Sequence, residues 1–476
     1  MNFASIAPEI ILTAGVLLVM VWEITTSGRQ NLGYLTALII IAAGAMVIGQ
    51  YDRVEVGFSG MVQADRFGHF FRLIIYLGAL LATMAAASSW HGEARGVFGA
   101  EFFSLLLVSV IGMDLLVIGA NLIVVFLGLE ILSLPLYAMA AGRTQSDTAV
   151  EAGAKYFLTG AFASGFLLFG IALVYGATGA FTFEGIGNAV SRGAQLDPLM
   201  WIGGVLLLVG FLFKIAAVPF HSWAPDVYTG APTPTVAFFA AAPKAAAVGL
   251  LLRLTLTALV DLPMETVFWV VAWLSMFVGN LWALRQRDLK RLLAYSGIAH
   301  IGYVLVGLCA KGSAAAGAVG FYLMGYAAMT VGAFAVVCAL ETKERAATLE
   351  TVAGLGRRRP GIAAALTIFM FALTGIPPTV GFAGKFAVFS EALKAGNLGL
   401  VIWAVMFSAV SVYYYLRVVV AMWMWPADES IPLPVPRGGI AGFGAVLILA
   451  SILTLLLGIY PQPFLKIASE SLFWLL

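Results

Sequence analysis

The sequence predicts an all-α integral membrane protein with about fourteen transmembrane helices. The 476 residues are 62% hydrophobic and 11% charged, with a mean hydropathy of +0.99. A water-soluble domain contains roughly 25% charged residues, so this composition excludes one. Apolar runs of about 20 residues, each long enough to cross a bilayer as a helix, recur along the whole chain. The net charge of +2 gives no indication of a nucleic acid or an acidic partner.

Two of the predicted helices are interrupted by prolines. The seventh runs into "VPFHSWAPDVYTGAPTPT", and the twelfth contains "TGIPPTVGFAGK". Proline removes a backbone donor and clashes with the preceding turn, so such a break persists in a membrane only where protein or a watery cavity satisfies the freed backbone groups. The fourteen helices are placed at about 8–25, 32–50, 69–89, 98–113, 116–140, 153–177, 201–219, 236–260, 265–284, 289–309, 314–340, 361–394, 398–425 and 439–460.

The spacing of the helices indicates an internal repeat. Helices four to eight begin near residue 98 and helices nine to thirteen near residue 265, and each group carries a lysine in its fourth, broken helix, Lys214 and Lys385. Because five is an odd number, the second group enters the membrane from the opposite side, as in the inverted repeats of transporters. The predicted segments are a three-helix N-terminal segment, a first repeat, an inverted second repeat and a C-terminal helix, at 1–97, 98–260, 265–425 and 439–476.

The basic residues of the short loops predict the orientation of the chain. If the N-terminus lies outside the cytoplasm, thirteen Lys and Arg residues fall in inward-facing loops and six in outward-facing loops. The positive-inside rule then places both termini outside, on the periplasmic side of a bacterial inner membrane. The inward set is Arg29, Arg95, Arg143, Arg285, Arg287, Lys290, Arg291, Lys343, Arg345, Arg357, Arg358, Arg359 and Arg437, and the outward set is Arg53, Arg66, Arg192, Lys311, Lys394 and Lys466.

Six ionisable residues lie inside predicted helices, away from their ends. A charge at the membrane centre costs about 3 kcal/mol on insertion scales, so such residues are expected to face the bundle interior and to mark an ion path. Among them we expect only Arg253 to be structural. The six are Glu130, Lys214, Lys244, Arg253, His300 and Lys385.

Glu130, about halfway along the fifth helix, and Lys214, in the broken seventh helix, are predicted partners because they lie at similar depth. Removal from water weakens a lysine's hold on its proton, and an adjacent carboxylate strengthens it. A lysine whose carboxylate partner can move away therefore switches between holding and releasing a proton. The alternative is a salt bridge that only holds two helices together.

The other buried residues also have structural alternatives. Lys244 lies near the start of its helix and could extend its side chain to the membrane surface. Lys385 follows the break at Pro377–Pro378 and could be purely structural. His300 could be a core histidine with satisfied hydrogen bonds or a relay that titrates near neutral pH.

Outside this set, Glu151 and Lys155 are spaced i, i+4 with the glutamate first, which favours a helix pair that is either functional or a plain surface pair. Cys309 and Cys338 are interpreted as small buried hydrophobic residues, because no cysteine or histidine cluster has the spacing of metal ligands. No glycine-rich nucleotide fingerprint opens a βαβ unit, so any redox cofactor is expected in another chain.

Four stretches resemble the antiporter-like membrane subunits of respiratory complex I, the proton-translocating NADH:quinone oxidoreductase, and among them subunit N. The resemblance implies two inverted five-helix repeats and no flavin, iron–sulfur cluster or NADH site in this chain. It also implies that proton translocation involves the residues that match the family's motifs, Glu130, Lys214, Lys244, Lys385, Glu151 and Lys155. The stretches are "LGLEILSLPLYAM", "FKIAAVPFHSWAPDVYTGAPTP", "DLKRLLAYSGIAHIGY" and "TGIPPTVGFAGKF".

The predicted function is that of a proton-pumping subunit of a respiratory enzyme, a translocase coupled to quinone reduction elsewhere in the complex. NADH, FMN, iron–sulfur clusters and quinone are expected in partner subunits, and neighbouring antiporter-like subunits and the lipid bilayer are expected contacts. The lysine at position 385 argues against the middle antiporter-like subunit, and the lack of a long lateral helix after residue 460 argues against the largest. The alternatives are a subunit of a multi-subunit cation/proton antiporter and a purely structural scaffold.

Overall fold

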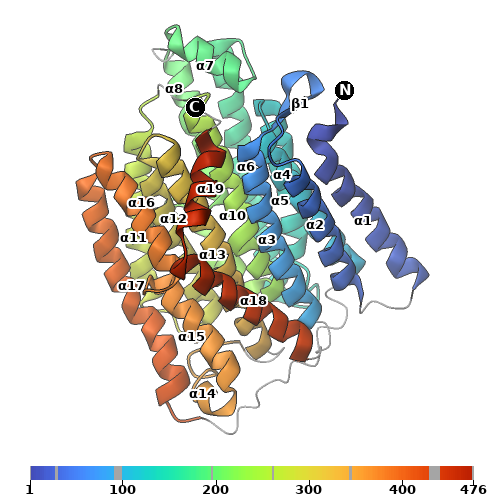
Figure 1. The fold of residues 1–476 in the computed structure, drawn as a ribbon, viewed down its shortest axis with the longest axis vertical. Coiled ribbons are helices and arrows are strands. Elements are labelled where there is room, and N and C mark those ends of the chain that lie inside the picture. The colour runs from blue at the N-terminus through green and yellow to red at the C-terminus, as the bar shows by residue number, and fades with distance from the viewer. Residues whose placement is uncertain are drawn as a thin grey trace.

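The fold is a bundle of mostly upright helices, shown in Figure 1. The computed structural model describes residues 2–26, 31–89, 99–194, 197–259, 262–341, 346–427 and 440–473. Within these ranges, twelve helices are long and apolar enough to cross a membrane. The two predicted crossings outside this set are the seventh and the twelfth, which are broken as the prolines predicted. The all-α membrane fold is confirmed.

The N-terminal segment contains three long helices and one element that the sequence did not predict, a two-stranded antiparallel hairpin in which Glu55 lies opposite Ala64. Each strand has only three residues, too few to leave an alternating pattern in the sequence. The elements are η1 (Phe3–Ile6), α1 (Ala7–Thr25), α2 (Leu32–Gly49), β1 (Glu55–Gly57), η3 (Phe58–Gly60), β2 (Val62–Ala64) and α3 (Arg66–Ser89).

The next seven helices hold the first broken crossing. The predicted boundary between residues 113 and 116 is wrong, because the chain turns later, where the side chain of Asn121 caps α5 by accepting a hydrogen bond from Ile123 N (2.8 Å). Asp114, which falls between the two predicted helices, therefore lies inside α4. The helices are α4 (Ala100–Ile118), α5 (Leu122–Ala140), α6 (Asp147–Thr178), α7 (Phe183–Ser191), α8 (Pro198–Lys214), α9 (Trp223–Gly230) and α10 (Thr233–Leu256).

The remaining helices hold the second broken crossing and the C-terminus. The predicted C-terminal helix is followed, after Pro461, by a short helix, α19, that packs against α13 of the same bundle and is not a long lateral helix. The helices are α11 (Glu265–Ala283), α12 (Leu289–Leu308), α13 (Ser313–Leu340), α14 (Leu355–Arg358), α15 (Pro360–Thr374), α16 (Val380–Lys394), α17 (Leu398–Met424), α18 (Ile440–Ile459) and α19 (Gln462–Phe473). The division of the chain into two repeats and two flanking segments stays a prediction.

Three helices, α10, α12 and α13, form the interior of the bundle, since nearly all their side chains are buried. In contrast, α6 and α17 present large apolar side chains outward, such as Phe162 on α6 and Tyr413 on α17. Because the surrounding solvent of a membrane protein is itself apolar, these outward side chains fit a lipid environment or a neighbouring membrane subunit. Two of the candidate site residues, Lys244 on α10 and His300 on α12, lie on these interior helices.

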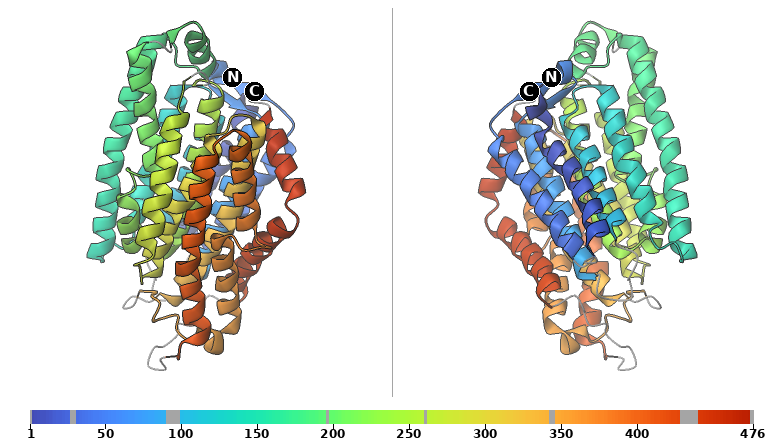
Figure 2. Two further views of the ribbon diagram at one scale, coloured as in Figure 1. Left: turned by 90° about the vertical axis from the view of Figure 1, so that its left-hand side faces the viewer. Right: turned by 90° about the vertical axis from the view of Figure 1, so that its right-hand side faces the viewer.

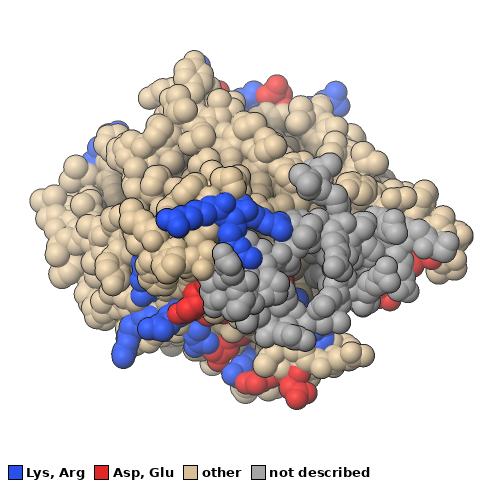
Figure 3. Space-filling view, turned by 90° about the horizontal axis from the view of Figure 1, so that it is seen from below, with Lys and Arg blue, Asp and Glu red and all other residues tan. Residues whose placement is uncertain are grey.

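The start of α1 and the end of α19 lie at the same end of the molecule, as Figures 1 and 2 show. This agrees with an even number of crossings. The opposite end carries α14 with Arg357 and Arg358, and Figure 3 shows Lys and Arg side chains gathered on it. Which end faces the cytoplasm stays a prediction, and five residues of the loop count lie outside the described ranges, namely Arg29, Arg95, Lys343, Arg345 and Arg437.

Candidate functional site

Lys214 is the last residue of α8 and is buried, with 3% of its surface exposed. The helix stops there because the chain departs from helical geometry at Ala216 (φ 58°) before Pro219. The ammonium Nζ donates hydrogen bonds to Ser133 Oγ on α5 (2.8 Å) and to Tyr156 OH on α6 (3.2 Å), and lies 5.2 Å from the centre of the Tyr156 ring. A buried ammonium is thus held by neutral hydroxyl groups and an aromatic face.

Glu130 lies one turn before Ser133 on the same helix and is half-buried. Its Oε1 atom is buried and has no hydrogen-bond partner among the described residues. The sequence led us to expect a direct ion pair between Glu130 and Lys214. The described residues contain no such pair, because Lys214 donates to the two hydroxyl groups instead. In this conformation Glu130 is a neighbour of the Lys214 site and not its hydrogen-bond partner.

Lys244 lies in the fourth turn of α10 and is 2% exposed, so the alternative that it extends to the membrane surface is wrong. Its ammonium faces the rings of Tyr228 (6.0 Å) and Tyr326 (5.7 Å). Gly297 on α12 makes room for it, since a Cβ atom at that position would lie 2.7 Å from Lys244 Nζ. The missing side chain at Gly297 therefore leaves the space that the Lys244 ammonium group occupies.

Lys385 lies in the second turn of α16 and is 5% exposed. Its Nζ donates hydrogen bonds to Leu373 O (3.2 Å), Thr374 O (2.9 Å) and Ser408 Oγ (3.0 Å). The two carbonyl groups belong to the last turn of α15, where no helical partner remains for them. The helix ends there at Gly375, whose φ of +92° suits glycine. The broken helix therefore supplies the groups that bind the lysine.

His300, on α12, is 1% exposed and has hydroxyl groups on both sides of its ring. Nδ1 lies 2.5 Å from Tyr322 OH, and Nε2 lies 3.1 Å from Tyr415 OH. A tyrosine hydroxyl can donate or accept, so the imidazole can carry its proton on either nitrogen. This arrangement suits a relay as well as a core histidine.

Aromatic side chains connect the three lysines and the histidine into one row, which we call the lysine–aromatic row. Tyr156, beside Lys214, stacks on Trp223 (4.3 Å between ring centres), which contacts Tyr228 (6.3 Å). Tyr326 lies 5.2 Å from the His300 ring, and Tyr303 lies 5.7 Å from it and 4.6 Å from Lys385 Nζ. The complete row is Lys214, Tyr156, Trp223, Tyr228, Lys244, Tyr326, His300, Tyr303 and Lys385.

Glu151 and Lys155 form the predicted pair (2.7 Å), but it is largely exposed and lies beside the row and not in it. Lys155 also binds Asp226 on α9 (3.0 Å), and Asp226 in turn binds Arg291 on α12 (2.9 Å). The surface pair is therefore one end of a network that joins α6, α9 and α12. Asp226 was not predicted to be a site residue, because it lies outside the predicted membrane-spanning helices.

A second network was missed because its lysine lies at a helix start and resembles a loop residue in the sequence. Lys290 is 2% exposed and donates to Ala231 O (2.8 Å) and to Glu341 Oε1 (3.4 Å). Glu341 also accepts a hydrogen bond from Thr233, the first residue of α10. Arg253 forms a buried two-fold hydrogen-bonded ion pair with Asp65 (2.7 and 2.9 Å), in keeping with the structural role expected for it.

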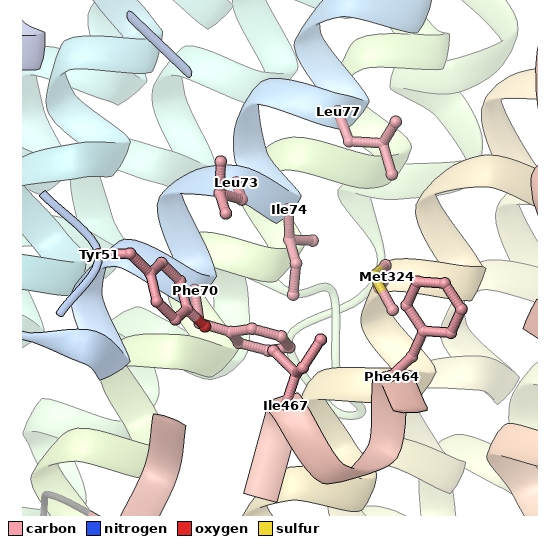
Figure 4. Close-up of a pocket in the computed structure, with 8 residues that line it drawn as sticks. All are labelled: Tyr51, Phe70, Leu73, Ile74, Leu77, Met324, Phe464 and Ile467. Carbon is pink, nitrogen blue, oxygen red and sulfur yellow. The ribbon is translucent and has the colours of Figure 1, made fainter. Parts of the chain in front are cut away.

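No group of His, Cys, Asp and Glu in the described ranges could hold a metal ion. A cavity of about 330 Å³ lies apart from the row, between α3, α13 and α19 (Figure 4). Its wall is almost wholly apolar, with side chains such as Ile74, Met324 and Phe464 facing one another across it. We assign no chemistry to this cavity, because it contains none of the charged residues above.

Two kinds of sequence comparison place the chain among known proteins. A family model described as "NADH:quinone oxidoreductase/Mrp antiporter, TM" matches residues 119–411. NADH-quinone oxidoreductase subunit N of Trichlorobacter lovleyi is 41% identical over 477 residues, covering 99% of this chain and 97% of the relative. Its counterpart from Myxococcus xanthus is 38% identical, with 97% and 96% covered.

Solved structures give the same result. A chain of respiratory complex I from Thermus thermophilus, solved with bound aureothin, has a TM-score of 0.82 and 37% identity, covering 96% of this chain and 98% of its own. A chain of the Mrp complex from Dietzia sp. has a TM-score of 0.87 over 99% and 97% of the two chains, at 22% identity, and shows a shared fold alone.

Proposed function

The chain belongs to the subunit N family of NADH-quinone oxidoreductases, and from this premise we propose that it conducts protons across the membrane while quinone is reduced elsewhere in the complex. It is a membrane-arm subunit of that enzyme. The observation that carries the proton-conducting role is the lysine–aromatic row. It joins three buried lysines and a histidine across both groups of helices.

The surroundings of the lysines support reversible proton binding. Lys214, Lys244 and Lys385 are surrounded by hydroxyls, carbonyls and aromatic rings, and none of them forms an ion pair among the described residues. A buried ammonium without a carboxylate partner is close in free energy to the neutral amine, because burial disfavours the charged form. A charge that arrives on a neighbouring group can therefore decide whether the lysine keeps its proton.

The remaining candidate residues have supporting roles in this proposal. His300 passes a proton between Lys244 and Lys385, since Tyr326 lies between it and the first and Tyr303 between it and the second. Glu130 adds negative charge one turn from Ser133, the hydroxyl that binds Lys214. Glu151 and Lys155 bring charge to an exposed part of α6 beside Tyr156, which belongs to the row.

The cofactors and partners follow from the family. We propose that NADH, FMN, the iron–sulfur clusters and the quinone are bound by partner subunits, and that the chain lies beside other antiporter-like subunits in a bacterial inner membrane. We also propose that both termini face the periplasm, because of the distribution of basic loop residues. The alternative, a cation/proton antiporter subunit, has weaker support, since the family model covers both classes and the Mrp chain is 22% identical, whereas a subunit N relative is 41% identical.

The test is Lys244→Met in the intact complex, with NADH:quinone activity and NADH-driven proton uptake into membrane vesicles as readouts. We expect both to fall strongly while the amount of assembled complex on a native gel is kept. Lys311→Met is the matched control, because Lys311 is an exposed lysine on the loop before α13. Wild-type proton uptake in an assembled Lys244→Met complex would refute the proposed role of the row.

A further inference from the structure

A second group of buried charges lies between α1, α3 and α4, away from the lysine–aromatic row. Glu9 on α1 is 4% exposed, and Arg72 on α3 and Asp114 on α4 are both fully buried. Arg72 Nη2 donates to Glu9 Oε1 and to Ser5 O (3.2 Å). Tyr76 on α3 donates its hydroxyl to Asp114 Oδ2 at 2.5 Å. We call these four side chains, Glu9, Arg72, Tyr76 and Asp114, the N-terminal charge cluster.

Other titratable groups border the cluster but do not neutralise it. His69 Nδ1 lies 3.5 Å from Arg72 Nη1, and the His69 ring lies 6.4 Å from that of Tyr51. Asp65, before α3, is fully engaged with Arg253 of α10 by two hydrogen bonds. Among the described residues, one guanidinium group therefore remains for two carboxyl groups.

The Arg72 guanidinium group is hydrogen-bonded to only one of these two carboxyl groups. It is hydrogen-bonded to Glu9, whereas Asp114 has only the neutral Tyr76 hydroxyl, and its Oδ1 atom is buried without a hydrogen-bond partner among the described residues. An isolated carboxylate is far more costly to bury than a carboxylic acid, so a group in this position takes up a proton. Arg72 and Tyr76 are spaced i, i+4 on α3, so Arg72 lies one turn from the residue whose hydroxyl binds Asp114.

We propose that Asp114 is a proton-binding site, neutral in the conformation described here, and that it exchanges its proton during turnover when Arg72 shifts from Glu9 toward it. Such a shift leaves the cluster's net charge unchanged, because Glu9 takes up a proton as Asp114 releases one. The proposal rests on the proposed proton conduction and adds a site to it. Glu9 is the third residue of α1, so this site lies near the end of the bundle where α1 begins and the chain termini lie (Figure 2).

The charge assignment is tested by assembly of the intact complex, measured on native gels. Asp114→Asn keeps the shape of a neutral acid, so we expect normal assembly. Because the proposed shift lets Arg72 pair with either carboxyl group, Glu9→Gln alone should still assemble, whereas Glu9→Gln combined with Asp114→Asn leaves the Arg72 charge buried and unpaired, so we expect assembly of this double variant to fail. Arg72→Met should be rescued by Glu9→Gln and not by Asp114→Asn. Loss of assembly in Asp114→Asn, or rescue of Arg72→Met by Asp114→Asn, would show that Asp114 is ionised and overturn the proposal.

The proton itself is tested on the assembled Asp114→Asn complex. The infrared difference between wild type and variant should contain the C=O stretching band of a protonated carboxyl group, and NADH-driven proton uptake should fall on the order of tenfold, because asparagine binds no proton. Asp197→Asn is the matched control: it caps α8, and asparagine caps a helix equally well. A spectrum with carboxylate bands alone, or wild-type proton uptake, overturns the proposal. If Lys244→Met is inactive in the same preparation, the proposed function stands.

Discussion

Gly297→Ala probes the lysine–aromatic row with a single methyl group. The added Cβ would lie 2.7 Å from Lys244 Nζ and 3.0 Å from Tyr326 OH, whereas ordinary contacts of a Cβ atom begin at 3.4 Å. Lys244 Nζ must therefore move by at least 0.7 Å (3.4 minus 2.7). The ammonium sits at the end of a flexible side chain, so it can move while the helices stay in place.

The expected loss follows from the geometry of proton transfer. A displacement of about 1 Å in a reacting group can cost about 100-fold in rate, so we expect NADH:quinone turnover to fall by about ten- to 100-fold. Assembly should be kept, because alanine is preferred over glycine in a helix by about 1 kcal/mol. Turnover is measured in membranes and divided by the amount of assembled complex on a native gel.

Two further glycines serve as controls for this prediction. Gly165 on α6 has no atom within 4 Å of its added Cβ, so Gly165→Ala should behave as wild type. Gly302, on the same helix as Gly297, would meet the backbone nitrogen of Met276 at 2.8 Å, so Gly302→Ala should impair the packing of α11 on α12 and reduce assembly. An assembled Gly297→Ala complex with wild-type turnover would refute the reasoning about Lys244.

Three other predictions follow from the site and the loops. Lys385→Arg keeps a charge that arginine does not release, so NADH-driven proton uptake should fall while assembly survives, and wild-type pumping in assembled Lys385→Ala would show the lysine to be dispensable. Glu130→Gln and Lys214→Met should each depress turnover strongly, and the free-energy loss of their double variant should be smaller than the sum of the two single losses by about 1 kcal/mol or more, whereas additive losses would mean independent action. A reporter active only in the cytoplasm should give signal in the loop at Arg357–Arg359 and none at the C-terminus, and the reverse pattern would contradict the orientation.

The sequence by itself determined which segments cross the membrane and where two of them break. Both depend on local chemistry, namely the length of an apolar run and the missing N–H of residues such as Pro219 and Pro378. Because charged and titratable residues are rare within apolar helices, four of them stood out in the sequence. These are Lys214, Lys244, His300 and Lys385, and all four are buried. Helix ends that no proline or break in the apolar run marks were predicted less accurately, as the turn at Asn121 shows.

The tertiary structure decided which faces are inside and which groups meet. The helices α6 and α10 are both apolar, yet one is exposed along much of its length and the other is enclosed, because lipid is as apolar as a protein core and leaves no amphipathic pattern to read. Arg72 and Asp114 gave no sign that they share a buried cluster, because the predicted helix bounds placed Arg72 in the first turn of a helix and Asp114 between two helices. Lys214 reaches Ser133 and not Glu130 because partners 81 residues apart in sequence are chosen by packing, which no local pattern records.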